Sequence, residues 1–257
     1  MFSIAALVPS PPILVPELCG GLAATPGIGQ PDVPLTLREA ALAAAGALAG
    51  TRKWLVVGTG TEDQALGADA LGTFRGFGAD VRVALSEAAM GDLSAEPDPE
   101  LPLPALVAGW LRGRAAPASE VSVRIVAADT SAERCAEIGA ELRGVLDGTP
   151  EPVGVLVVAD GAATLSLKAP GYLDPRAEAV QAGLDRALSH GDRAGLLALD
   201  PALCAELVMS GRAAYQVLAG LFAADAADPA VETLYQDAPF GVGYDVSVWR
   251  PADGDTP

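Results

Sequence analysis

Residues 153–163 read VGVLVVADGAA, and this run decides the fold. The stretch from Val153 to Ala159 carries no charged or polar side chain, which is typical of a strand buried on both faces of a parallel sheet. We therefore expect this strand to lie at the centre of the sheet. Ligands of α/β sheets bind beyond the carboxyl ends of the strands. Asp160 and the residues that follow it, as far as Ala163, are thus the first candidates for a site.

On either side of this run, short strand-like segments alternate with longer helical ones, a pattern typical of a mainly parallel sheet with flanking helices. Further strands are expected at 3–8, 54–57, 80–85, 121–127, 231–235 and 243–249. Helices are expected at 36–49, 130–146, 175–189, 201–209 and 212–222, and one more runs through Trp110 after a Pro- and acid-rich loop at 91–104. No linker or internal repeat divides the chain. The sequence therefore predicts a single-domain α/β protein over residues 1–257, with a mainly parallel central sheet, helices on both faces and a polar tail from about residue 250.

Two of the expected helices carry capping signals. Thr36 is expected to be the N-cap of the helix 36–49, and Gly50 stands where a C-terminal glycine belongs. Thr130 and Glu133 have the spacing of a capping box, which places the start of the helix 130–146 at Thr130.

Composition limits the classes of partner. The chain of 257 residues has 33 acidic and 16 basic side chains, a net charge of −17, so nucleic acid and anionic membranes are poor partners. No apolar run of about 18 residues predicts a membrane span. The three cysteines, Cys19, Cys135 and Cys204, are far apart, which predicts small core residues rather than disulfides and a cytoplasmic protein.

Two motifs that often carry chemistry have simpler interpretations here. Gly58-Thr59-Gly60 follows an expected strand and could let backbone amides approach an anion. Since no GxGxxG motif or Walker-type lysine accompanies it, a tight strand-to-loop turn is favoured. The one histidine, His190, stands at an expected helix end, where imidazole interacts favourably with the helix dipole. No Gly-x-Ser-x-Gly motif supports a hydrolase.

One histidine and scattered cysteines do not suffice for the common zinc sites. A carboxylate-only site for a hard cation remains open, with Glu17, Asp129 or Asp160 as ligands.

Several stretches, spread over nearly the whole chain, resemble the superfamily of class III extradiol dioxygenases (LigB-type) and Memo-like proteins. They are Val8 to Glu17, similar to a Pro-His-Pro-Pro-apolar-Pro-Glu opening; Trp54 to Gly60, similar to the strand before a Ser-Pro-His turn; Asp160 to Tyr172; Ser210-Gly211-Arg212, similar to Cys-Gly-Arg; and Asp237 to Tyr244, which contains Pro-Phe-Gly-Val-Gly-Tyr. Their order and spacing make the resemblance specific. It implies the LigB/Memo-like α/β fold and, in ring-cleaving members, a non-haem Fe(II) site held by two histidines and a carboxylate.

This chain departs from the family at the positions that matter for iron. Ser10 and Gly60 stand where the resemblance places the two ligand histidines, Ala163 stands at the acid/base histidine, and Ser210 at the Memo-type cysteine. Asp160 still matches, as do Glu17 and Arg212 in the surrounding stretches. Hydroxyl is a poor iron ligand, and Gly and Ala have no donor atom. We therefore expect no Fe(II) and no other cofactor in this vestigial pocket.

Three interpretations follow. The first is a pseudoenzyme that binds a small molecule or supports a partner subunit, as a homo-oligomer or beside a related chain, because some extradiol dioxygenases pair an active subunit with one that lacks ligands. The second is a metal-independent enzyme in the same pocket, with Ser10, Thr59, Asp160 and Ser210 supplying hydrogen bonds and a carboxylate as general base. The third is an extradiol dioxygenase whose iron ligands are supplied otherwise.

Overall fold

A central seven-stranded sheet organises the computed structural model, which describes residues 2–19 and 33–252. The strand order is β3-β6-β2-β7-β1-β9-β8. The bounds are β1 Phe2–Val8, β2 Lys53–Gly60, β3 Gln64–Leu66, β6 Glu120–Ala127, β7 Val153–Val158, β8 Ala230–Asp237 and β9 Tyr244–Arg250. The four inner strands β6, β2, β7 and β1 run parallel, whereas β3 at one edge and β9 and β8 at the other are antiparallel to their neighbours. The predicted single-domain α/β fold with a mainly parallel sheet is confirmed.

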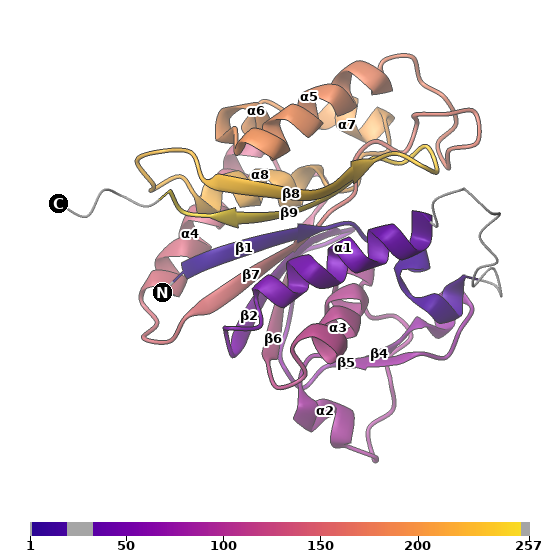
Figure 1. Ribbon diagram of the computed structural model, residues 1–257, viewed down its shortest axis with the longest axis vertical. Coiled ribbons are helices and arrows are strands. Elements are labelled where there is room, and N and C mark those ends of the chain that lie inside the picture. Colours follow the sequence, from indigo (N-terminus) through magenta and orange to yellow (C-terminus); the bar gives the residue numbers. More distant parts are fainter. Residues whose placement is uncertain (1, 20–32, 253–257) are drawn as a thin grey trace.

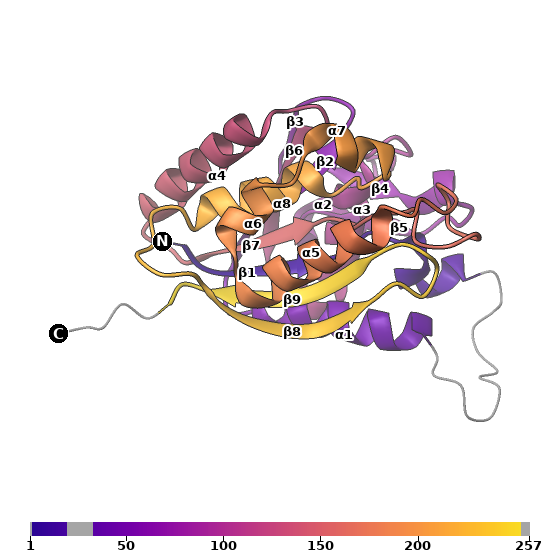
Figure 2. The ribbon, with the colours of Figure 1, turned by 90° about the horizontal axis from the view of Figure 1, so that it is seen from above.

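Helices cover both faces of this sheet (Figures 1 and 2). α1 (Val33–Ala47) and α3 (Leu103–Ala115) pack on one face. The other face carries α4 (Ala132–Asp147), α5 (Ala177–His190), α6 (Arg193–Leu197), α7 (Pro201–Glu206) and α8 (Arg212–Leu221). Short 3-10 helices occur at Pro12–Leu14, Pro16–Leu18 and Phe74–Phe77.

The middle strand β7 explains why residues 153–159 are apolar throughout. Val155 and Val157 point into the core beneath α4, α5 and α8, while Leu156 and Val158 point into the core beneath α1 and α3. All four side chains are at most 2% exposed. Burial on both faces therefore requires an apolar residue at every position of this strand.

The expected strand 80–85 exists but lies outside the central sheet. It is β5 (Arg82–Ala84), which pairs with β4 (Leu71–Thr73) in a separate two-stranded sheet, followed by α2 (Glu87–Gly91). The expected loop 91–104 is shorter than predicted at both ends, because α2 ends at Gly91 and α3 begins at Leu103.

Both predicted N-caps are wrong, and Gly50, the predicted C-terminal glycine, lies three residues beyond the end of α1 at Ala47. α1 begins at Val33, so Thr36 lies inside the helix and not at its N-cap. Pro34 suits this earlier start, because the first turn does not use its missing N–H. The N-cap of α4 is Ser131, whose hydroxyl accepts from the backbone N of Arg134 at 3.2 Å. The N-cap is therefore one residue later than Thr130, so Thr130 and Glu133 do not form the predicted capping box.

The predicted turn at Gly58-Thr59-Gly60 is also wrong. These residues continue β2 and pair with Ile125 to Ala127 of β6. A Cβ atom on Gly58 would lie 2.4 Å from Cβ of Pro104, and one on Gly60 would lie 2.6 Å from Cγ2 of Ile125. The glycines therefore permit close approach of α3 and of a β6 side chain. They do not form a phosphate-binding turn.

No helix in the described part of the chain is both long and apolar enough to cross a membrane.

Candidate functional site at the carboxyl edge of the sheet

Ser10 and Asp160 meet at the carboxyl edge of the parallel strands. Ser10 follows β1 and Asp160 follows β7, and these neighbouring strands stay in register to their ends, where Ala159 N donates to Val8 O at 3.0 Å. The backbone N of Ser10 donates to Oδ1 of Asp160 at 2.9 Å, and the Ser10 hydroxyl donates to Oδ2 in a short hydrogen bond. Both carboxyl oxygens of Asp160 are thus bonded to one residue of the loop after β1.

The Asp160 side chain is partly buried. Burial raises the pKa of the Asp160 carboxyl, and the two hydrogen bonds from Ser10 act in the opposite direction. Two tyrosines lie nearby: burial and, secondarily, the charge of Asp160 raise the pKa of both Tyr215 on α8 and Tyr244 on β9. The Tyr215 hydroxyl donates to Ala159 O at 3.2 Å. Asp160 is therefore a partly buried carboxyl with a raised pKa, beside two buried phenol groups.

The other predicted pocket residues reach the same edge through their backbones. Gly60 ends β2, and its carbonyl accepts from Ala128 N at 2.9 Å. Ala163 is buried and donates its backbone N to Leu207 O at 3.1 Å. Ser210 is exposed and precedes Gly211, whose N donates to Asp160 O at 3.0 Å.

The structure therefore places all five predicted pocket residues at the carboxyl edge. Among their side chains, however, the recorded bond to the Asp160 carboxylate comes from Ser10 alone. Thr59, proposed as a hydrogen-bonding group, has a buried hydroxyl for which the described residues supply no partner.

The segment that resembles the family's Pro-Phe-Gly-Val-Gly-Tyr ending packs directly on the Asp160 loop. Gly161 N donates to Gly243 O at 2.8 Å, and Gly243 N donates to Ala162 O at 3.0 Å. Gln181 on α5 braces this pair, because its Oε1 accepts from Ala162 N at 2.8 Å. Sequence reasoning missed Gln181. The available signal was a polar residue on the otherwise apolar face of α5, among Ala177, Leu184 and Leu188.

Arg212, another residue of the resemblance, does not contact Asp160. It is 3% exposed, and its guanidinium donates to the carbonyls of Ala128 and Thr130 and to Oε1 of Gln216. It therefore holds the connection between β6 and α4.

A cavity of about 170 Å³ lies next to Ser210, between α7 and the start of α8. Val208, which lines it, has a φ of +53°, a conformation that a β-branched residue adopts only under strain. Such strain is concentrated at functional sites.

The residues at this edge do not fit an iron site. Ser10, Gly60 and Ala163 provide no imidazole, and both Asp160 oxygens are engaged by Ser10. The alternative of a carboxylate-only site is also not supported, since residues 2–19 and 33–252 contain no group of three or more His, Cys, Asp or Glu side chains that could hold a metal ion. Glu17 and Asp129, the other two predicted ligands, are both exposed.

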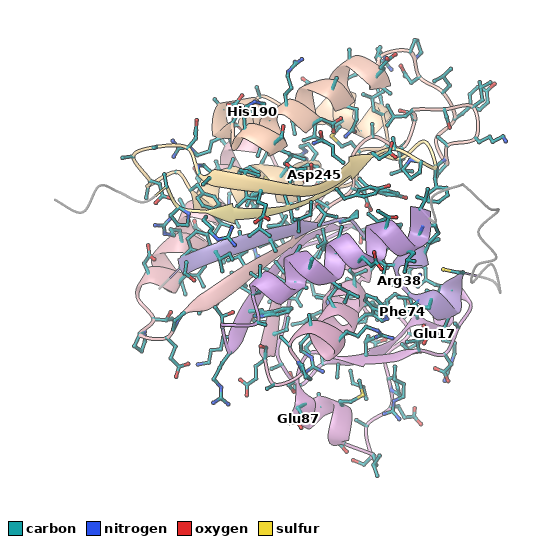
Figure 3. The ribbon with its side chains drawn as sticks, in the orientation of Figure 1. Glu17, Arg38, Phe74, Glu87, His190 and Asp245 are labelled. Atoms are coloured by element: carbon teal, nitrogen blue, oxygen red, sulfur yellow. The ribbon has the colours of Figure 1, made fainter. Side chains whose placement is uncertain are left out.

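His190 is distant from this edge in the fold. It ends α5, with Nδ1 at 2.9 Å from Arg186 O, and Gly191 follows with a φ of +68°. Figure 3 shows His190 over the helical layer and Glu17 at the opposite side of the view, near Arg38. His190 also lines an open groove of about 600 Å³ between α5, α6 and α7. Its expected place at a helix end is confirmed.

The cysteines are free in the structure. Cys135 and Cys204 are buried, as predicted. Cys19 is only partly buried, and its thiol lies 3.4 Å from Ile13 O and 3.5 Å from a guanidinium nitrogen of Arg38.

No family model and no curated protein matches the sequence. Among solved structures, the chain is similar to the uncharacterized protein JW3007 from Escherichia coli K12, with a TM-score of 0.52 and 12% identity. The match covers 96% of this chain and 99% of the other. This likeness extends over the whole fold and concerns the fold alone. Membership of the LigB/Memo superfamily stays a prediction.

Proposed function

We propose that this protein is a metal-independent binding protein, a pseudoenzyme with an extradiol-dioxygenase-like fold that holds a small molecule at the carboxyl edge. The observation that carries the proposal is the Ser10–Asp160 pair. A carboxylate that ligates a metal or accepts a proton must have a free oxygen. In this protein, both carboxyl oxygens of Asp160 are bonded to Ser10 in the loop after β1. Asp160 acts as a clamp that joins two strand ends.

Exposed apolar side chains beside the clamp support a binding role. Three segments that are tied together by backbone hydrogen bonds, 163–174, 207–211 and 238–243, surround the edge. They carry five large apolar side chains that are 43–63% exposed: Leu167, Tyr172, Leu173, Val208 and Phe240. Apolar surface gathered in one place is typical of binding sites. Tyr172, like Val208, has a positive φ.

A metal-independent enzyme is the second candidate, because burial raises the pKa of Asp160 and a carboxyl with a raised pKa suits general acid/base catalysis. The Ser10 bonds count against it, since a base must release its partners to accept a proton.

Metal content is the measurement that tests the proposal. We expect protein purified without chelators or an affinity tag to contain far less than one transition-metal atom per chain by elemental analysis, and to remain so after anaerobic addition of Fe(II). The conservative variant Asp160→Asn keeps the shape of the side chain and serves as control. Near-stoichiometric iron in the wild type that is lost in Asp160→Asn would refute the proposal and favour a dioxygenase.

A further inference from the structure

The cavity beside Ser210 has a buried floor and an exposed mouth. Its floor includes Cys204, Met209 and Arg212, all at most 4% exposed. Its mouth is formed by exposed residues, among them Val208 and Ser210. The cavity is thus a hollow that opens to solvent and has the buried Arg212 among its lining residues.

Within the part of the chain that the structure describes, no carboxylate forms an ion pair with Arg212. Its oxygen acceptors, the carbonyls of Ala128 and Thr130 and the side-chain amide of Gln216, are all neutral. None of the ion pairs recorded within residues 2–19 and 33–252 involves Arg212, whereas Arg143 pairs with both Asp147 and Asp225. A guanidinium has five N–H groups, and Arg212 has four recorded acceptors, these three oxygens and the Cys135 thiol at 3.8 Å, all of them neutral. Buried charges are rarely left unpaired.

Arg112 is a useful comparison because it is also buried and also donates to carbonyl oxygens, those of Ala84 and Pro117. Burial lowers the pKa of Arg112, and the negative charge of Glu87 partly offsets this effect. Arg112 thus has an acidic side chain as a neighbour, whereas Arg212 lies beside a cavity.

The other groups around the cavity suit a negative ligand. Burial raises the pKa of the Cys204 thiol to about 11, so the thiol is neutral at physiological pH. Ser210 offers a hydroxyl donor at the mouth. α8 begins at Arg212, so the positive end of its dipole lies at this position. The acidic group that acts on Cys204 is Asp200, whose carboxylate is held by Leu203 N at 2.7 Å.

We propose that this cavity binds a compact oxyanion, a phosphate or a carboxylate group, with Arg212 supplying the charge and Ser210 a hydrogen bond. Guanidinium groups match the paired oxygens of both. A volume of about 170 Å³ admits one such group and little else. The inference rests on the proposed binding function and names its ligand class.

Calorimetric titration with inorganic phosphate and, separately, acetate in low-salt buffer tests this inference. Ser210→Asp places a negative charge at the mouth and leaves Arg212 in place. Ala49→Asp, in an exposed turn after α1, is the charge-matched control. We expect saturable binding of at least one anion by the wild type and Ala49→Asp, and binding at least about tenfold weaker by Ser210→Asp, equivalent to ~1.4 kcal/mol. Circular dichroism establishes that both variants are folded.

The outcomes separate this inference from the proposed function, because metal content is measured on the same samples. Tighter binding of phosphate than of acetate identifies a phosphoryl group as the ligand, and the reverse identifies a carboxylate. Absence of saturable binding, or equal binding by Ser210→Asp and the wild type, overturns the anion site. Metal-free protein in that case leaves the proposed function standing.

Discussion

Asp160, which is partly buried, and Asp245, which is fully buried, are two carboxylates of one sheet that differ in where their partners lie. Asp160, at the end of β7, is bonded by Ser10, which is 150 positions away in sequence. Asp245, within β9, accepts from Ser247 at 2.7 Å and from Gln236 at 2.8 Å, both in the β8–β9 hairpin (Figure 3). Burial raises the pKa of both carboxyls. Asp160 therefore joins two segments that are distant in sequence, whereas Asp245 forms hydrogen bonds within one hairpin. The structural role of each carboxylate depends on where its hydrogen-bond partners lie.

The two regions are connected through α5. Gln181 accepts from Ala162 N beside Asp160 and donates to Oδ1 of Asp185 at 2.7 Å. Asp185 in turn contributes, after burial, to the raised pKa of Asp245. A displacement of Gln181 beside Asp160 can thus move Asp185 and alter the pKa of Asp245.

The largest effect is expected from Asp245→Asn as a function of pH. Burial raises the pKa of Asp245 from 3.8 to about 6, so the folded state holds its proton over a range where the unfolded state has lost it. The protonated carboxyl therefore contributes its maximum to the free energy of unfolding below about pH 4. This contribution decreases as the pH rises to about 6 and is constant at higher pH. We expect the stability of the wild type relative to Asp245→Asn to fall by about 3 kcal/mol between pH 4 and 7.

Urea denaturation of both proteins across this range measures the difference. Subtracting the variant removes the contributions of carboxylates with lowered pKa, such as Asp174, which have the opposite sign. A difference that stays constant with pH would show that Asp245 is ionised in the folded state at pH 4, and that its burial has no cost.

A double-mutant cycle on Ser10→Ala and Asp160→Asn measures the clamp. Because Ser10 bonds the carboxylate through its hydroxyl and its backbone N, we expect a coupling free energy of about 2 kcal/mol from the hydroxyl bond alone. The matched cycle on Ser247→Ala and Asp245→Asn should give about 1 kcal/mol, since Gln236 also donates to the Asp245 carboxyl and remains in place when Ser247 is removed. Equal couplings in urea denaturation at pH 5 would erase the distinction between the two carboxylates.

Local pattern was sufficient to predict most of the fold. The alternation of strands and helices predicted the parallel sheet. The apolar run 153–159 predicted its central strand, because a strand buried on both faces has an apolar residue at every position. Signals that depend on a single position were less reliable. The cap of α4 is displaced from Thr130 to Ser131, since both residues can accept the same kind of bond.

At the site, the sequence predicted the position of the residues but not their bonds. Ser10, Gly60 and Asp160 lie at one edge because neighbouring parallel strands end together, and backbone hydrogen bonds bring the segments of Ala163 and Ser210 to the same edge. The close approach that makes Gly58 and Gly60 necessary is set by Pro104 and Ile125, which are distant in sequence. The role of Gln181 depends likewise on the packing of α5 against two glycines. Contacts of this kind have no local pattern.

The smallest effect concerns that packing and tests whether Gln181 couples the two regions. A Cβ on Gly243 would lie 2.3 Å from Cδ of Gln181, so Gly243→Ala must displace the side chain that holds Ala162 N. We expect a loss of about 1.5 kcal/mol in the free energy of unfolding.

Gly183→Ala is the matched control on the same helix, because nothing lies within 4 Å of its Cβ position, and it should stabilise the protein by about 0.7 kcal/mol through helix propensity. If Gln181 transmits the change, Gly243→Ala will also shift the pH at which Asp245 titrates, as measured by the pH dependence of stability, whereas Gly183→Ala will not. A loss of stability without that shift would mean that the two carboxylates act independently, and that α5 only separates them.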